Sequence, residues 1–419
     1  MPEVPGILRY SATCEIGLAP VVITVRGVAD REALDAQDAV EVPMIARLLS
    51  SAAAAVFGLA WLAGPARADT DDALCGAEGF ACHQVAVSAS PLPAPTGPHP
   101  VGRVDVQLGD EEQAVMVSAW YPAAEAGMPT SYIPASGPDA DIRIAGQAAT
   151  WLHSPVSAAA AIGATAPAAE NPPADTTLGR LPVLLMSPGL GTPRWILSGL
   201  AADLASRGWA VVVADHTGES PAVEFPSGRV VLGDPPVMTD AYMRDRLAAR
   251  VADARTVLDR LDELPVIGDL IDPGRIAMLG HSYGGYTAVS MAAADRRIRA
   301  AVVLDGSAGW HDGSSVERDG LDRPVMLVGY GAMVDASWIS FGHHTPGPFT
   351  VAMVRGGEHY TPTDLPHLGG PRELCGTLAP DRAAAVTRGL VADFLAHAVL
   401  GRPATGAVWP EVEWSAPMA

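Results

Sequence analysis

Short apolar runs alternate with helical patterns along most of the chain. The apolar and β-branched runs predict eight strands, at Val104–Leu108, Val115–Tyr121, Leu181–Met186, Ala210–Asp215, Arg275–Gly280, Ala300–Leu304, Pro324–Tyr330 and Thr350–Arg355. Helical patterns occur among the later runs, at Ile196–Ser206, Tyr242–Leu264, Gly284–Ala294 and Pro380–Leu400. This alternation predicts an α/β fold with a mostly parallel, eight-stranded sheet flanked by helices.

The two kinds of strand pattern indicate how the sheet is built. The later runs are apolar throughout, which is expected of central parallel strands that are buried on both faces. The first two runs follow each other with no helix between them. We therefore expect an antiparallel pair at that end of the sheet.

The segment from Met44 to Ala68 has the pattern of a secretory signal peptide. A weakly positive start is followed by an apolar run from Leu48 to Gly64 and by the small-residue motif Ala66-Arg67-Ala68. We expect residues 44–68 to be cleaved and the protein to be secreted. A membrane anchor through residues 45–64 is the alternative.

The remaining segments divide around one large domain. Residues 1–43 are interpreted as an over-extended N-terminus or, with an anchor, as a cytoplasmic tail. Residues 69–92 form a linker in which Cys75 and Cys82 could form a disulfide, although pairing of Cys375 with either stays open. Residues 93–402 form the main domain, with a C-terminal tail at 403–419. The Ala/Pro-rich segment 145–177 predicts an exposed insertion or flexible loop, with an active-site lid as the alternative.

Composition narrows the function classes. The 419 residues are 49% hydrophobic and 18% charged, which supplies a large core. The net charge of −20 argues against nucleic acid as a partner, because such binding needs a basic face. All 27 basic residues are arginine, so a Schiff-base lysine and the lysine of a phosphate-binding loop are excluded. The metal-ligand spacings C-x-x-C and H-E-x-x-H are not in the sequence, and we expect neither a metal nor a cofactor.

A candidate nucleophile lies at Ser282. The sequence Gly280-His281-Ser282-Tyr283-Gly284 matches G-x-S-x-G, directly after an apolar strand and before a helix of small residues. A tight turn between strand and helix exposes the serine oxygen, and glycines at both sides allow the two elements to approach. The alternative is an ordinary glycine-rich turn.

A serine nucleophile needs a base and an acid that orients it, and these follow in the order Ser, Asp, His in this type of sheet. Asp305 comes directly after strand Ala300–Leu304, and His359 follows strand Thr350–Arg355. Both lie where parallel strands end, which is where such sheets place catalytic groups. We predict His359 as the base and Asp305 as the acid. The alternatives are His343 and His344 for the base, and Asp364 and Asp322 for the acid.

Two further histidines lie near the predicted site, whereas the others are read as solvated. His281 is expected to point away from the attack face, and His216 follows another strand end and could line the pocket. The solvated, non-catalytic histidines are His83, His99, His311, His367 and His397.

The developing oxyanion needs two N–H donors. One is predicted at Tyr283, the residue after the nucleophile. The other is predicted at Leu190, in the glycine-rich turn Ser187–Gly191 after an early strand. A plain connecting loop is the alternative for that turn.

These motifs together resemble those of bacterial platelet-activating-factor acetylhydrolase-like α/β-hydrolases, a family related to secreted lipases, cutinases and polyester hydrolases. The resemblance covers roughly residues 92–400. It rests on Gly280–Gly285 and on Ser187–Gly191, Leu204–Gly208, Asp215-His216, Pro95–Gly102 and Trp120–Pro122. Pro188 departs from the family, which often has histidine there, and so does the insertion at 145–177.

The resemblance implies an α/β-hydrolase fold and a cofactor-free Ser-His-Asp esterase that acts on lipid or short-acyl esters. By this resemblance, the nucleophile would be Ser282, the acid Asp305 and the base His359, and the oxyanion donors would be Leu190 and Tyr283. We expect a monomer whose partner is a small-molecule or lipid ester, with contact to a membrane surface or polymer substrate as an option. The alternatives are a polyester or cutinase-like hydrolase and a non-catalytic exported binding protein.

Overall fold

The computed structural model describes residues 7–16, 19–28, 92–110, 114–137, 140, 143–148, 159–162, 164–310, 315–331 and 334–415. The chain divides into two compact units, residues 1–78 and 79–419. In the first unit, β1 (Ile7–Ile16) and β2 (Ala19–Val28) form an antiparallel hairpin with Ile7 opposite Val28. The predicted signal peptide and the Cys75–Cys82 pair lie outside the described residues. No helix in the described part of the chain is long and apolar enough to span a bilayer.

Within the described residues, the second unit is built on an 11-stranded sheet. From one edge to the other, its strands are β15 (Val412–Ser415), β14 (Phe349–Val354), β13 (Val325–Tyr330), β12 (Ile298–Leu304), β11 (Ile271–His281), β7 (Leu181–Ser187), β8 (Ala210–Ala214), β4 (Val115–Pro122), β3 (Val101–Leu108), β6 (Thr165–Glu170) and β5 (Pro129–Ser131). The six strands from β14 to β8 are mutually parallel, and β3 and β4 form the expected antiparallel pair. The mostly parallel α/β class is thus confirmed.

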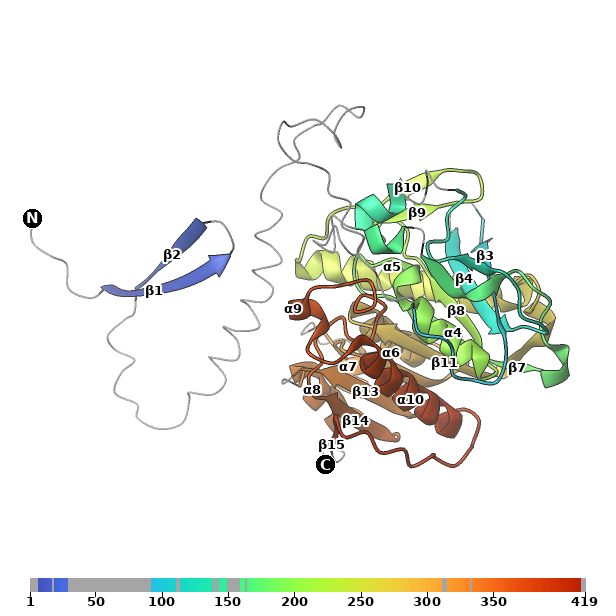
Figure 1. Ribbon diagram of the computed structural model, residues 1–419. Coiled ribbons are helices and arrows are strands. Elements are labelled where there is room, and N and C mark those ends of the chain that lie inside the picture. The colour runs from blue at the N-terminus through green and yellow to red at the C-terminus, as the bar shows by residue number, and fades with distance from the viewer. Residues whose placement is uncertain are drawn as a thin grey trace, which may run out of the picture. The chain divides into compact units, whose positions relative to one another are not determined.

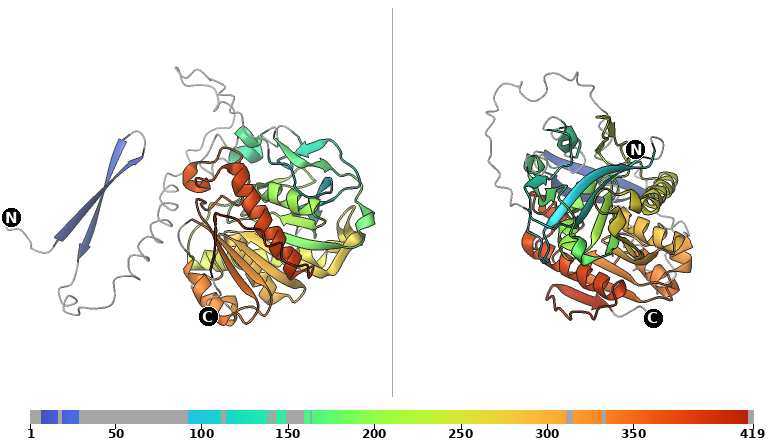
Figure 2. Two further views of the ribbon diagram at one scale, coloured as in Figure 1. Left: turned by 60° about the horizontal axis from the view of Figure 1, so that its bottom comes forward. Right: turned by 90° about the vertical axis from the view of Figure 1, so that its right-hand side faces the viewer.

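Helices cover both faces of this sheet (Figure 1). One face carries α4 (Ser198–Ser206) and α10 (Pro380–Ala398), and the other carries α5 (Asp240–Asp259) and α6 (Tyr283–Ala294). Helix α10 lies across the front of the sheet in the left view of Figure 2. The shorter elements are η2 (Thr176–Leu178), η3 (Arg194–Leu197), β9 (Ala222–Glu224), β10 (Val230–Leu232), η4 (Leu261–Glu263), η5 (Gly268–Leu270), α7 (Ser315–Asp319), α8 (Ala336–His344) and α9 (Arg372–Cys375).

Alternating side chains of the central strands fill two separate cores. In β7, Leu184 and Met186 join the core under α4 and α10, whereas Val183 and Leu185 join the core under α5 and α6. This follows from the period of two in a strand, which sends neighbouring side chains to opposite faces. The central strands are therefore fixed from both sides, and their carboxyl ends form a rigid edge.

Three predictions about the chain's organisation are wrong in the described residues. The sheet has more than eight strands, because β5, β6 and β15 extend its edges. Within segment 145–177, residues 165–170 are not a loop, since they form β6, which pairs with β3 and β5 and buries Ala166 and Ala168. The tail at 403–419 contributes β15, which pairs antiparallel with β14. These edge strands are short or rich in alanine, so they lack the apolar run that identified the others.

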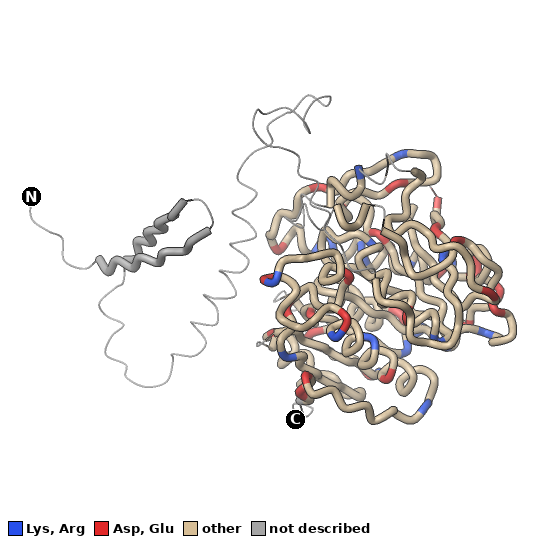
Figure 3. Tube along the Cα trace, in the orientation of Figure 1, with Lys and Arg blue, Asp and Glu red and all other residues tan. Residues whose placement is uncertain are grey.

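Charged positions are distributed over many elements. Arginine positions are interspersed with aspartate and glutamate positions along the trace (Figure 3). Several charges are instead buried in pairs, among them Arg194 with Asp215 and Arg250 with Glu219. Burying such charges costs free energy unless each is paired and hydrogen-bonded. These buried pairs therefore hold the segments that carry them in a fixed position.

Candidate active site

Ser282 forms the sharp turn between β11 and α6. Its backbone has φ 55° and ψ −126°, a conformation that a residue with a side chain rarely adopts. The surrounding structure holds it there: Ser282 N–H donates to Leu304 O over 2.9 Å, and Gly285 N–H donates to Ser282 O over 2.8 Å. Glycine is required beside the turn, because a Cβ at Gly280 would overlap the Gly284 carbonyl.

His359 and Asp305 complete a chain of hydrogen bonds that begins at Ser282. The distance from Ser282 Oγ to His359 Nε2 is 2.9 Å, and the distance from His359 Nδ1 to Asp305 Oδ2 is 2.7 Å. The other oxygen of Asp305 accepts from Tyr330 N–H over 2.6 Å. Since a carboxylate only accepts, Nδ1 of His359 carries the proton and Nε2 is free to accept from the serine.

The same group is open to solvent on one side. The side chain of His359 is 39% exposed, whereas that of Asp305 is 20% exposed. His359 is therefore accessible from solvent, while Asp305 behind it is more enclosed. This arrangement can abstract the serine proton and return it to a leaving group.

His281 supports His359 rather than reacting. It is buried, and its Nε2–H donates to the backbone carbonyl of His359 over 2.7 Å. Burial, and then the neighbouring His359, lower the pKa of His281 to about 3. The imidazole therefore stays neutral near physiological pH and fixes the backbone of the segment that carries His359.

The alternative bases and acids are not part of this hydrogen-bond chain. His343 and His344 lie at the end of α8, and His344 Nδ1–H donates to the backbone carbonyl of Ser340. Asp322 pairs with Arg296 and Arg323 on the surface.

Asp364 and His367 also have roles other than the predicted ones. Asp364 is buried, accepts from Gly199 N–H and is bonded to the Tyr132 hydroxyl. Burial raises its pKa to about 7. His367 was expected to be solvated, but it is only 4% exposed, because its ring packs near α10 and bonds to Asp381.

The turn that we call the oxyanion loop, Ser187–Thr192, lies against the nucleophile. A Cβ placed on Gly189 would be 3.2 Å from the Ser282 Cβ. Pro188 has no N–H, and the N–H groups of Gly191 and Thr192 donate to Glu219 and to the Gly189 carbonyl. Among the described residues, no acceptor within the chain is found for Leu190 N–H. The loop can thus present an N–H group beside Ser282.

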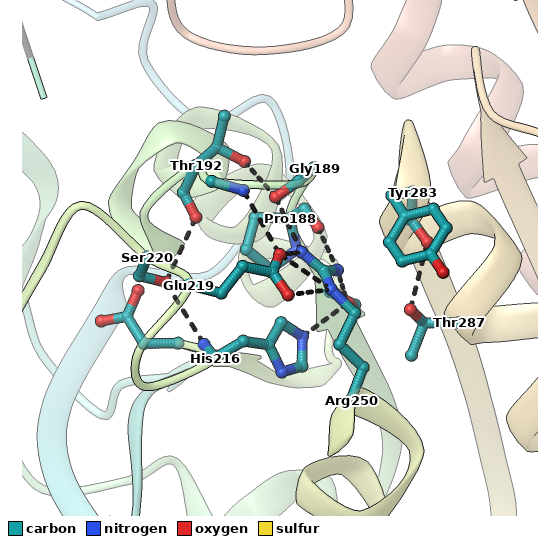
Figure 4. Close-up of polar contacts among 12 residues, drawn as sticks. Pro188, Gly189, Thr192, His216, Glu219, Ser220, Arg250, Tyr283 and Thr287 are labelled. Atoms are coloured by element: carbon teal, nitrogen blue, oxygen red, sulfur yellow. Dashed lines mark hydrogen bonds and ion pairs between the residues drawn. The ribbon is translucent and has the colours of Figure 1, made fainter. Parts of the chain in front are cut away.

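Sequence reasoning missed the groups that hold this loop from behind. Arg250 of α5 and Glu219 form a buried ion pair beneath it (Figure 4). His216, which the sequence offered as a possible pocket residue, is buried and bonded to Ser187 Oγ and Asp253. A charged residue on a polar helix ordinarily indicates a solvated face, so the sequence carried no signal for Arg250.

Family models match two overlapping parts of the chain. The model of platelet-activating factor acetylhydrolase, isoform II, matches residues 85–227, and the model of the alpha/beta hydrolase fold matches residues 182–327. The chain therefore has the α/β-hydrolase fold, and its resemblance to the acetylhydrolases is confirmed.

Curated relatives come from a fungus and from vertebrates. A probable 1-alkyl-2-acetylglycerophosphocholine esterase from Arthroderma benhamiae is 30% identical over 221 residues, or 48% of this chain and 54% of that protein. Platelet-activating factor acetylhydrolase from Cavia porcellus is 24% identical over 241 residues, or 51% and 55%. The chain thus matches about half the length of these relatives. The restriction to bacterial members stays a prediction.

A solved structure matches over a larger part of the chain. The ferulic acid esterase from Streptomyces cinnamoneus superposes with a TM-score of 0.64 at 29% sequence identity. The match covers 78% of this chain and 99% of the other. The similarity thus extends over most of the unit that contains Ser282, Asp305 and His359.

Proposed function

We propose that this chain, which has the α/β-hydrolase fold, is a serine carboxylic-ester hydrolase that works through an acyl-enzyme. The observation that carries the proposal is the hydrogen-bond chain from Ser282 Oγ through His359 to Asp305. Its members come from three strand ends and meet at a turn held in an otherwise unfavourable conformation. The esterases to which the chain is similar support the same reaction class.

The first half of the reaction forms the acyl-enzyme. Ser282 Oγ attacks the ester carbonyl while His359 Nε2 takes its proton, and Asp305 stabilises the resulting imidazolium. The negative oxygen of the tetrahedral intermediate is stabilised by the N–H groups of Leu190 and Tyr283. The intermediate collapses when the C–O bond to the alcohol breaks, and His359 returns the proton to the departing oxygen.

The second half releases the acid. Water gives a proton to His359 Nε2 and attacks the acyl carbonyl, and the new tetrahedral intermediate expels Ser282 Oγ, which regains its proton from His359. No net proton is consumed within the site. Apart from the ester and the water, each group in this scheme is a side chain or backbone N–H of this chain.

The favoured substrate is an ester with a short acyl group on a lipid alcohol. This rests on the similarity to proteins described as acetylhydrolases and an acetylglycerophosphocholine esterase. Hydrolysis of hydroxycinnamate esters is a second candidate, because the ferulic acid esterase match covers nearly all of that chain.

We also propose that the protein is exported after cleavage at Ala68. N-terminal sequencing of the secreted protein should then give Asp69 as the first residue.

The test compares the full chain with Ser282→Ala on p-nitrophenyl esters from acetate to palmitate, on an acetylated ether phospholipid and on methyl ferulate. We expect wild-type hydrolysis of the short esters and a loss of roughly 10³-fold or more in the variant. The two natural-type substrates then distinguish the lipid from the hydroxycinnamate candidate. A folded wild type with no activity above Ser282→Ala on any ester would favour the non-catalytic binding protein.

A further inference from the structure

The oxyanion loop is held from behind by one buried guanidinium. Arg250 NH1 donates to Pro188 O over 2.8 Å, and NH2 donates to Gly189 O over 3.0 Å. NH1 also donates to Ser187 Oγ over 3.2 Å. The side chain of Arg250 is 1% exposed, so these contacts are made in the interior, where each hydrogen bond counts more than in water (Figure 4).

Two of these acceptors are carbonyls of consecutive peptide groups. In a planar trans peptide, the C=O of one residue and the N–H of the next point in opposite directions. When Gly189 O is turned toward Arg250, Leu190 N–H must point away from it. The same argument applies to Pro188 O and Gly189 N–H. The guanidinium thus fixes the orientation of two peptide planes, including the one that carries the predicted oxyanion donor.

Arg250 is itself held in place. Glu219 accepts from Arg250 Nε over 2.9 and 3.0 Å and from NH2 by a shorter contact, and it also accepts from Gly191 N–H over 3.3 Å. Burial disfavours the charged form of Glu219, but Arg250 outweighs it, so the pKa of Glu219 lies below its ordinary value. The pair is therefore ionised. Glu219 holds Arg250 in place and, through Gly191 N–H, also binds the end of the oxyanion loop.

Three other contacts restrict the same region. Ser187 Oγ is 2.8 Å from His216 Nε2, and His216 Nδ1 is 2.8 Å from Asp253 Oδ2. The donation from His216 to the carboxylate leaves Nε2 to accept the Ser187 proton, so the Ser187 oxygen can receive Arg250. Arg250 also lies 5.3 Å from the ring centroid of Tyr283, the residue that supplies the second predicted donor.

We propose that Arg250, fixed by Glu219, is a positioning residue that aims the Leu190 N–H at the oxyanion. The inference rests on the proposed esterase function. It predicts that loss of the guanidinium reduces the stabilisation of the transition state. Ground-state binding of the ester should stay nearly unchanged, because the oxyanion exists only after attack.

The test measures kcat and KM for p-nitrophenyl acetate in Arg250→Met, Arg250→Lys and Glu219→Gln. It also measures inhibition by an aryl trifluoromethyl ketone, which forms an anionic tetrahedral adduct with a reactive serine. In Arg250→Met we expect kcat to fall roughly 10²-fold and the ketone to bind weaker by a similar factor. KM should change less than about threefold. Arg250→Lys should recover part of kcat, because it keeps the charge but not the forked geometry.

Arg103→Met is the matched control. Arg103 is also buried, pairs with Asp105 and donates to the Ser131 carbonyl, but its contacts lie on β3, β4 and the β5 region rather than at the oxyanion loop. It should lower thermal stability without changing ketone affinity.

The proposal is overturned if Arg250→Met keeps wild-type kcat, or if its loss of kcat comes without weaker ketone binding. If Arg250→Met does not fold, Arg250→Lys and Glu219→Gln decide by the same two readouts. A wild type that neither hydrolyses the ester nor binds the ketone would instead reject the esterase function itself.

Discussion

Gly284→Ala tests whether esterase activity requires the close approach of α6 to the oxyanion loop. A Cβ at this position would lie 2.6 Å from Pro188 O and still closer to Ser187 O, whereas ordinary contact begins at 3.4 Å. The loop and the helix would have to separate by more than about 1 Å to relieve both contacts. Because Ser282 is on one side of this contact and Leu190 on the other, the nucleophile and the oxyanion donor would move apart.

A misplacement of this size can cost roughly 10²-fold in rate. Stability should change much less, because overpacking costs about 1–3 kcal/mol while alanine gains about 1 kcal/mol over glycine in a helix. We therefore expect kcat/KM for p-nitrophenyl acetate to fall about 10²-fold, while the protein stays folded and loses at most about 2 kcal/mol of stability.

Gly146→Ala is the matched control, since its Cβ would meet no described atom within 4 Å in the helical residues 143–148. It should leave kcat/KM as it is. Wild-type kcat/KM in a folded Gly284→Ala protein would refute the reasoning that the two elements must touch.

Three further changes probe other parts of the structure. Asp305→Asn should lower kcat by about 10⁴-fold in ester hydrolysis, because an amide cannot stabilise the protonated form of His359; retention of more than a tenth of the rate would exclude Asp305 as the acid. Burial raises the pKa of Asp364 to about 7, so unfolded chains release this proton first and stability should fall as pH rises from about 4 through 7, by on the order of 4 kcal/mol. Urea unfolding at the two ends of this range should show a flatter profile in Asp364→Asn, and an equal slope would contradict the assignment. Burial raises the pKa of the Cys375 thiol to about 12, so peptide mapping should find it alkylated by iodoacetamide only after unfolding.

The central strands could be predicted because burial on both faces leaves a continuous apolar run. Each of the eight predicted runs coincides with a strand in the sheet. The edge strands could not be predicted in this way: β5 has three residues, β6 reads Thr-Ala-Pro-Ala-Ala-Glu, and β15 is four residues long. Their pairing depends on the neighbouring strand being present, which is information that no local pattern contains.

In the candidate site, too, some residues could be predicted from local sequence patterns and others could not. Ser282, Asp305 and His359 could be found because each follows a recognisable strand, and the topology then brings parallel strand ends together. Arg250 could not be found, because its partners at Ser187, Pro188 and Glu219 are 31 to 63 residues away in sequence. Its helix carries many charges, and only the packing of α5 against the sheet shows which arginine is buried.

The most direct test of the account is to trap the acyl-enzyme. Full-length protein is mixed with p-nitrophenyl acetate, quenched in acid within the first turnover and digested for mass spectrometry. The account predicts that the mass of one acetyl group is added to the peptide that contains Ser282, that the signal builds up with the burst of p-nitrophenol, and that it is absent in Ser282→Ala. Turnover of the ester with no acetyl group on Ser282, or with the acetyl group on another residue, would contradict it.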